Sequence, residues 1–139
     1  GPLDRDTQKA FSAALKEKLG GDGADVVVDI VGGDLTEPAL RATAWLGRFL
    51  VIGFPAGIAK IPANLALLKS CDIRGVFWGA AVERDKPAHH EAMDRLLQML
   101  SDGRINPRIH ATYGLADAGK AIAALSSRAV LGKIVVTLD

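Results

Sequence analysis

Apolar residues recur along the chain in two alternating patterns, one at helical spacing and one nearly continuous. Residues 6–19 place alanine, phenylalanine and leucine at helical spacing and end at a run of glycines, so we expect a helix that Asp6 or Thr7 caps. Residues 26–31 are β-branched and almost all apolar, which is typical of a strand covered on both faces in a parallel sheet. The same patterns predict further strands at residues 49–52, 72–78, 109–113 and 133–138, and further helices at 34–44, 63–69, 87–102 and 115–126.

Strands and helices alternate with short links, and this order predicts an α/β fold with a mostly parallel sheet and right-handed crossovers. Residues 83–86 are all charged and are expected to form a solvated loop. The helix at residues 87–102 carries one apolar stripe, formed by Met93, Leu96, Leu97 and Leu100.

Composition narrows the class of protein. The chain has 139 residues, of which 49% are hydrophobic and 24% charged, and this length suits one globular domain. The net charge is +1 with both signs interspersed, so no basic field for nucleic acid is present. No apolar run approaches the roughly 20 residues of a membrane span, and no secretory signal is recognisable. Cys71 is the only cysteine, which excludes a disulfide within the chain, and we expect a reducing, cytoplasmic compartment.

Glycine follows each of the first three predicted strands, as Gly32 with Gly33, as Gly53 and as Gly79. In an open α/β sheet, ligands bind beyond the carboxyl ends of the strands. A residue without Cβ lets a flat ligand lie against the backbone and leaves N–H and C=O groups free to bond it. These glycines therefore predict a ligand site at one edge of the sheet, the alternative being that each glycine only ends its strand.

Motifs for phosphate and metal binding are weak or absent. The glycine-rich run at residues 20–23 follows a helix and precedes a strand, which is the wrong context for a dinucleotide fingerprint. His89 and His90 are adjacent and His110 stands alone, so we expect no metal site. No nucleophile, general acid or general base can be named, and the catalytic residues stay unknown.

Three further residues have two interpretations each. Lys133 starts the last predicted strand, where its ammonium group either stays in water or meets a phosphate. Trp45 and Trp78 are expected to serve packing, the alternative being a platform for a cofactor. Trp78 stands at a strand end, where aromatic rings often line sites or interfaces.

Several segments resemble the zinc-free NADPH:quinone oxidoreductase branch of the medium-chain dehydrogenase/reductase superfamily. The likeness covers the chain after about Phe11, in the order and spacing of that branch. Its segments are residues 23–34, 47–54, 61–64, 75–79 and 132–136. The resemblance implies a partial doubly wound (Rossmann-like) parallel sheet, in which residues 1–104 form the C-terminal part of a dinucleotide-binding domain. Residues 105–139 would be the strand-helix-strand segment that completes the catalytic domain.

The resemblance also implies a cofactor and a reaction. Members of the branch pass a hydride from NADPH to a quinone or another activated double bond. The family positions around the nicotinamide end match a defined set of residues here, with Lys133 also near the cofactor. These residues are Val31, Gly32, Gly33, Ile52, Gly53, Phe54, Pro55, Val76, Phe77, Trp78 and Lys133.

Family members are about twice as long or more, and their phosphate-binding loop precedes the part that this chain resembles. The first residue is not Met, and Gly1-Pro2-Leu3 is typical of a cloning remnant, so we expect the chain to be a piece of a longer protein. As given, it is expected to be inactive and to bind NADPH weakly, because the pyrophosphate anchor is missing. The choice between NADPH and NADH is not encoded in these residues.

A partial sheet is also expected to expose an edge and an apolar flank, which favours self-association. In the branch, the strand matching residues 76–78 lies at a sheet edge that joins two subunits, so a homodimer is expected. The alternative function is a non-catalytic α/β module for dimerisation or for binding a nucleotide or an acyl ligand.

Overall fold

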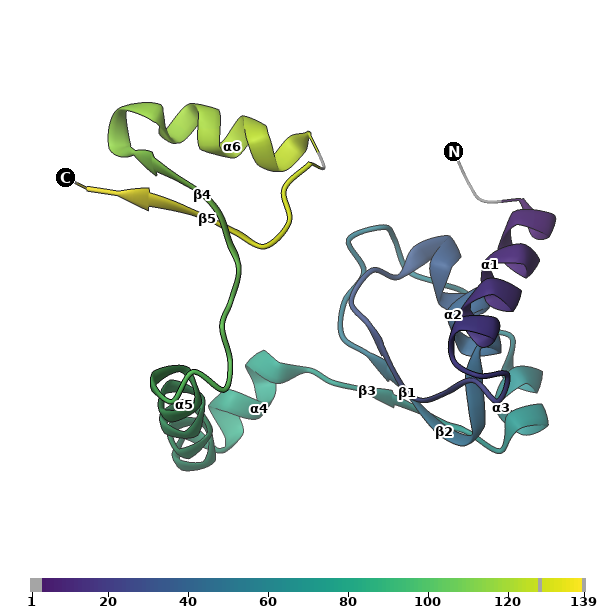
Figure 1. Ribbon diagram of the computed structural model, residues 1–139. Coiled ribbons are helices and arrows are strands. Elements are labelled where there is room, and N and C mark those ends of the chain that lie inside the picture. Colours follow the sequence, from purple (N-terminus) through teal and green to yellow (C-terminus); the bar gives the residue numbers. More distant parts are fainter. Residues whose placement is uncertain (1–3, 128, 139) are drawn as a thin grey trace. The chain divides into compact units, whose positions relative to one another are not determined.

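The computed structural model describes residues 4–127 and 129–138, which form two compact units divided between Arg84 and Asp85 (Figure 1). Gly1, Pro2 and Leu3, interpreted above as a cloning remnant, lie outside the described residues. Each unit has its own parallel sheet, so the predicted α/β class is confirmed. The functional boundary between residues 104 and 105 stays a prediction.

The first unit is a three-stranded parallel sheet with helices between its strands. The strand order is β1-β2-β3, so β1 and β3 are its edges. Its elements are α1 (Arg5–Lys18), β1 (Ala24–Asp29), the 3₁₀ turn η1 (Gly33–Leu35), α2 (Thr36–Arg41), β2 (Thr43–Val51), α3 (Ala63–Lys69), β3 (Asp72–Gly75) and α4 (Trp78–Arg84).

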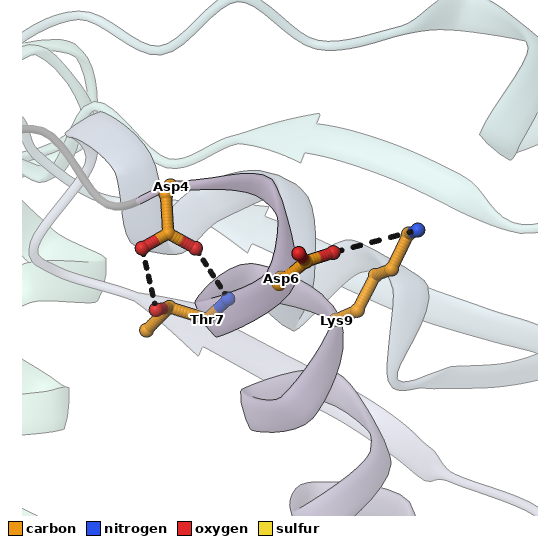
Figure 2. Close-up of polar contacts among 4 residues, drawn as sticks. All are labelled: Asp4, Asp6, Thr7 and Lys9. Atoms are coloured by element: carbon orange, nitrogen blue, oxygen red, sulfur yellow. Dashed lines mark hydrogen bonds and ion pairs between the residues drawn. The ribbon is translucent and has the colours of Figure 1, made fainter.

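Helix α1 begins earlier than predicted, because its cap is Asp4 and not Asp6 or Thr7. The Asp4 carboxylate accepts hydrogen bonds from the Thr7 backbone N–H at 2.8 Å and from the Thr7 hydroxyl at 3.0 Å (Figure 2). Asp6 instead forms an exposed ion pair with Lys9 at 3.9 Å. One carboxylate thus satisfies a free N–H of the first turn, which is what a cap must do.

The second predicted helix, residues 34–44, is too long. Helix α2 ends at Arg41, and Thr43 already pairs with β1. The irregular start of β2 explains the error. Only one residue of β1 separates Ala24 from Val26, whereas four residues separate their partners Thr43 and Arg48.

The extra residues of β2 form a bulge. Leu46 has φ +58 there, and both Leu46 and Trp45 are exposed, so the prediction that Trp45 serves packing is wrong. Gly47 belongs to this bulge within β2. A Cβ on Gly47 would lie 2.7 Å from the Thr43 methyl group, which explains why glycine stands there.

The third predicted strand, residues 72–78, is also too long. Its neighbour β2 ends at Val51, and the last ladder hydrogen bond runs from the Val76 N–H to the Val51 carbonyl at 2.9 Å. Beyond that point no ladder to β2 continues among the described residues, and the chain turns into α4. The charged residues 83–86 are consequently not a loop: α4 runs to Arg84, and α5 begins at Lys86.

The two faces of the β1-β2-β3 sheet differ. On one face, Phe49 packs with Leu40 of α2 and Leu65 of α3, and all three are almost fully buried. On the other face, Val26 is 55% and Val28 58% exposed. The prediction that the strand at residues 26–31 is covered on both faces is thus wrong, because α2 and α3 pack on the same side of the sheet. The expected apolar flank is present.

The second unit has a two-stranded parallel sheet, with the helix between its strands packed against it and another helix before it in the chain. Its elements are α5 (Lys86–Ser101), β4 (Ile109–Gly114), the 3₁₀ turn η2 (Leu115–Asp117), α6 (Ala118–Ser126) and β5 (Lys133–Thr137), with β4 and β5 parallel. All agree with the sequence patterns to within a few residues. The Asp85 carboxylate caps α5 by accepting from the Ala88 N–H at 3.0 Å. The apolar stripe of α5, from Met93 to Leu100, is partly exposed. Within the two described ranges, no helix is both long and apolar enough to cross a bilayer.

Candidate functional site

The carboxyl ends of β1, β2 and β3 lie along one edge of the sheet, because all three strands run parallel. The Ile52 N–H donates to the Asp29 carbonyl at 2.9 Å, and the Val76 N–H donates to the Val51 carbonyl at the same distance. The structure therefore brings the ends of these three strands together. The third strand ends at Gly75, so the prediction that Gly79 follows it directly is wrong, and Gly79 lies in α4.

A cavity of about 540 Å³ lies between the ends of β2 and β3. None of its lining side chains is ionisable, so it offers apolar walls and bare backbone. Gly75 has nothing within 4 Å of the place a Cβ would take, and the nearest atom at Gly53 lies 3.9 Å away. The lining residues are Val51, Ile52, Gly53, Phe54, Gly75, Val76 and Phe77, five of which were predicted site residues. We call this space the apolar cavity.

Gly32 and Gly33 lie in a different environment. Both have positive φ, +73 and +60, and the loop after β2 lies directly against them. The Gly33 N–H donates to the Gly57 carbonyl at 2.7 Å, and a Cβ on Gly32 would stand 2.6 Å from that same oxygen. Packing of two loops thus explains these glycines. Val31 and Pro55 belong to the same pair of loops, and none of these four predicted site residues lines the apolar cavity.

Sequence analysis missed Asp29, which holds the turn after β1. Its buried carboxylate accepts from the N–H groups of Val31 at 3.0 Å and Gly32 at 2.8 Å, and from the Thr36 hydroxyl at 2.6 Å. Burial raises the pKa of Asp29, but the hydrogen bonds from Gly32, Thr36 and Val31 outweigh it, and the pKa lies below its ordinary value of 3.8. An acidic residue inside an apolar run, directly before a glycine pair, was the available signal.

Two further predicted site residues belong to other elements. Trp78 starts α4 and lines a neighbouring cavity with Arg48 and Arg74. Lys133 starts β5 of the second unit, where its backbone N–H donates to the Arg108 carbonyl at 2.8 Å. Its predicted role at the cofactor stays a prediction.

Donors for a metal do not assemble in the described ranges. No group of three or more His, Cys, Asp or Glu side chains there is placed to hold an ion. Cys71 is buried, and the rings of His89 and His90 lie 5.8 Å apart at the start of α5. His110 accepts a long hydrogen bond, 3.5 Å, from the Leu131 N–H.

Comparison with known proteins gives a consistent result. The family model described as zinc-binding dehydrogenase matches residues 3–136. Quinone oxidoreductase-like protein 2 of Bos taurus is 36% identical over 130 residues, which are 93% of this chain and 37% of that protein. Prostaglandin reductase-3 of Bos taurus is 34% identical, over 99% of this chain and 40% of that protein.

The fold agrees with solved structures as well. The crystal structure of a probable oxidoreductase from Mycobacterium abscessus superposes with a TM-score of 0.75 at 25% identity, over 99% of this chain and 39% of that one. The chain therefore spans less than half the length of the relatives and structures that it matches.

Proposed function

This chain belongs to the zinc-binding dehydrogenase family of the medium-chain dehydrogenase/reductase superfamily, and on that premise we propose that it forms the nicotinamide end of the cofactor site of an oxidoreductase. The proposed reaction is hydride transfer from NADPH to a quinone or another activated double bond. Relatives described as quinone oxidoreductase-like and as a prostaglandin reductase support this reaction class. The observation that carries the proposal is the apolar cavity at the ends of β2 and β3.

The residues of the apolar cavity fit a flat, uncharged ring. Gly53 and Gly75 leave backbone uncovered on two neighbouring strands, and the half-exposed ring of Phe54 lies beside them. When bound, NADPH would supply the hydride from its nicotinamide ring. The chain itself would orient that ring and keep water from it, and these lining residues would move no proton, because none of them is ionisable.

Zinc plays no part in the proposed step. The family description names a zinc-binding dehydrogenase, but the described residues bring no suitable donor set together. A structural zinc site takes four such protein ligands, and a catalytic zinc site takes three. Residues 4–127 and 129–138 therefore do not fit the metal, and we derive no chemistry through it.

The chain as given is proposed to bind intact NADPH only weakly. A glycine-rich phosphate loop after a strand is what anchors a pyrophosphate, and this sequence has none. Titration with NADPH is expected to show binding weaker than micromolar, and tight micromolar binding would refute this part of the proposal.

The partner is proposed to be a second copy of the chain, joined through the edge strand β3. All four residues of β3 are exposed, and its outer edge carries unpaired backbone groups in the described structure. Light scattering at high protein concentration is expected to give a dimer, and a clean monomer contradicts it.

The compartment is proposed to be the cytoplasm, which a fluorescent fusion tests.

The nicotinamide site itself is tested with reduced nicotinamide mononucleotide, which lacks the adenosine half of the cofactor. We expect amide shifts in NMR spectra at residues 51–54 and 75–77. Gly53→Val should weaken binding about tenfold by filling the cavity, without unfolding the chain, since a Cβ there meets nothing closer than 3.9 Å. Gly114→Val is the matched control, because a Cβ at Gly114 also meets no close atom and lies on β4. Shifts elsewhere, or equal effects of both variants, would sink the proposal.

A further inference from the structure

A second cavity, of about 470 Å³, lies on the uncovered face of the first sheet. The strand register pairs Arg48 with Asp72 and Leu50 with Arg74, so these four side chains share that face. The cavity walls include Arg48, Leu50, Arg74, Phe77, Trp78 and Ala81, from β2, β3, α4 and the link before α4. We call this space the arginine cavity.

Positive charge in the arginine cavity is only partly neutralised. Arg48 faces the Asp72 carboxylate at 3.7 Å, and the two side chains are 50% and 72% exposed. A pair so long and so exposed is weak. Arg74 is exposed and, in the part of the chain that the structure describes, makes no side-chain hydrogen bond or ion pair. The one nearby carboxylate, that of Asp72, therefore faces Arg48 alone, and the positive charge of Arg74 is left for an outside anion.

Two aromatic side chains complete the walls. Phe77 is 81% and Trp78 64% exposed, and they are consecutive at the junction of β3 and α4. Rings exposed to this degree beside arginines present apolar faces that a second planar group can cover. Arginine also stacks on aromatic faces, so a planar ligand can contact both kinds of group.

From this placement we propose that the arginine cavity binds a planar aromatic molecule that carries a carboxylate or a phosphate. The guanidinium forks recognise two oxygens of the carboxylate or phosphate through paired N–H donors. Phe77, Trp78 and Leu50 cover the aromatic part. A volume of about 470 Å³ is within the range of small-molecule sites.

The arginine cavity is chemically distinct from the apolar cavity, although Gly75, Val76 and Phe77 line both. Only the arginine cavity has ionisable walls. Ligand binding in the arginine cavity therefore does not depend on the proposed oxidoreductase function. A ligand that binds only when it carries an anionic group distinguishes the arginine cavity from the apolar cavity.

The test uses 1-naphthyl phosphate and 1-naphthoate as probes, with uncharged 1-naphthalenemethanol and inorganic phosphate as comparisons. Calorimetry should show that both aromatic anions bind more tightly than either comparison molecule. Arg74→Gln should weaken their binding about tenfold, and Arg48→Gln less, because Asp72 already engages Arg48. Trp78→Leu should weaken the aromatic anions and leave inorganic phosphate unchanged. A preference between naphthyl phosphate and naphthoate would identify which anion the site favours.

Arg104→Gln is the matched control, because Arg104 is exposed and lies outside both cavities. Arg74 lies on the proposed dimer strand, so the substitution could also change dimerisation. Light scattering of Arg74→Gln therefore checks whether any loss of ligand binding is accompanied by a change in oligomeric state. The proposal is overturned if the uncharged alcohol binds as tightly as the anions. It is equally overturned if Arg74→Gln and Arg104→Gln have the same effect, or if neither aromatic anion binds at millimolar concentration.

Discussion

Two pairs of glycines at the same edge of one sheet have different physical roles. Gly32 and Gly33 have positive φ and lie against the backbone of residues 56 and 57, so a side chain there would overlap that backbone. Gly53 and Gly75 do not have positive φ, and a Cβ on either would meet nothing closer than 3.9 Å. The first pair is required by the path of the chain, whereas the second pair is free to serve a ligand.

The difference shows what a glycine at a strand end can mean. The run after each strand looks alike in the sequence, and only the neighbouring loop decides whether the missing Cβ makes room for protein or for a ligand. Of the glycines weighed from the sequence, Gly32 and Gly33 are explained by packing of the chain, whereas the ligand interpretation of Gly53 stays a prediction. Gly75 was not among the glycines weighed. Substitutions at the two pairs should therefore separate stability from binding.

The largest effect is expected for Gly32→Ala. Positive φ costs a non-glycine residue about 1–2 kcal/mol, and overlap with the Gly57 carbonyl adds to it, so we expect a loss of about 3 kcal/mol in the free energy of unfolding. Urea denaturation followed by circular dichroism measures it. Gly20→Ala is the control, because Gly20 has φ +81 but nothing within 4 Å, and it should lose only about 1 kcal/mol. Equal losses would mean that the loop contact at Gly32 is unimportant.

A somewhat smaller effect is expected for Asp29→Ala, which removes the acceptor that holds the turn beside Gly32. Two backbone N–H groups and the Thr36 hydroxyl lose their partner, and we expect about 2 kcal/mol of lost stability. Asp25→Ala, an exposed position on the same strand, should change stability by less than about 0.5 kcal/mol. If the two variants are alike, the turn does not depend on this carboxylate.

Lowering the pH should gradually remove the stabilisation that the Asp29 carboxylate provides. Because the hydrogen bonds lower the pKa of Asp29 in the folded state, its stabilisation is complete above the ordinary pKa of 3.8 and is lost as pH falls through the lower, folded-state pKa. Urea midpoints of the wild type and Asp29→Asn should therefore differ above pH 4 and converge in stronger acid. A difference that stays constant into acid would exclude Asp29 as the titrating group.

The smallest effect on stability is expected for Gly75→Ala. Nothing lies within 4 Å of the added methyl group, so the free energy of unfolding should change by less than about 0.5 kcal/mol. Binding of reduced nicotinamide mononucleotide should nevertheless weaken, because Gly75 lines the apolar cavity. A large loss of stability with intact binding would reverse the proposed assignment of the two glycine pairs.

Local patterns in the sequence were sufficient for most of the fold. The helix at residues 63–69 was predicted with its observed bounds, and the parallel arrangement follows from the alternation of strands and helices. The end of β3 was not predictable from its own residues, because it is set by where β2 stops. The same limit applies to Val26 and Val28, whose apolar character does not reveal which face of the strand the helices cover.

The candidate site was predictable only in part, for a similar reason. Glycines after strands pointed to one edge of the sheet, and five of the residues that the family resemblance implied line one cavity there. The role of Asp29 depends on Thr36, seven residues further along, and the arginine cavity depends on the register between β2 and β3. Contacts between residues that are distant in the chain do not produce a pattern that can be read from neighbouring residues in the sequence.

The bulge in β2 has a practical consequence for anyone who follows unfolding. Trp45 is 65% exposed on that bulge and Trp78 64% exposed at the start of α4, and these are the only tryptophans in the chain. Both indoles are already largely hydrated in the folded state, so their emission should shift little when the chain unfolds. Intrinsic fluorescence would then be nearly silent through a transition that far-ultraviolet spectra record in full.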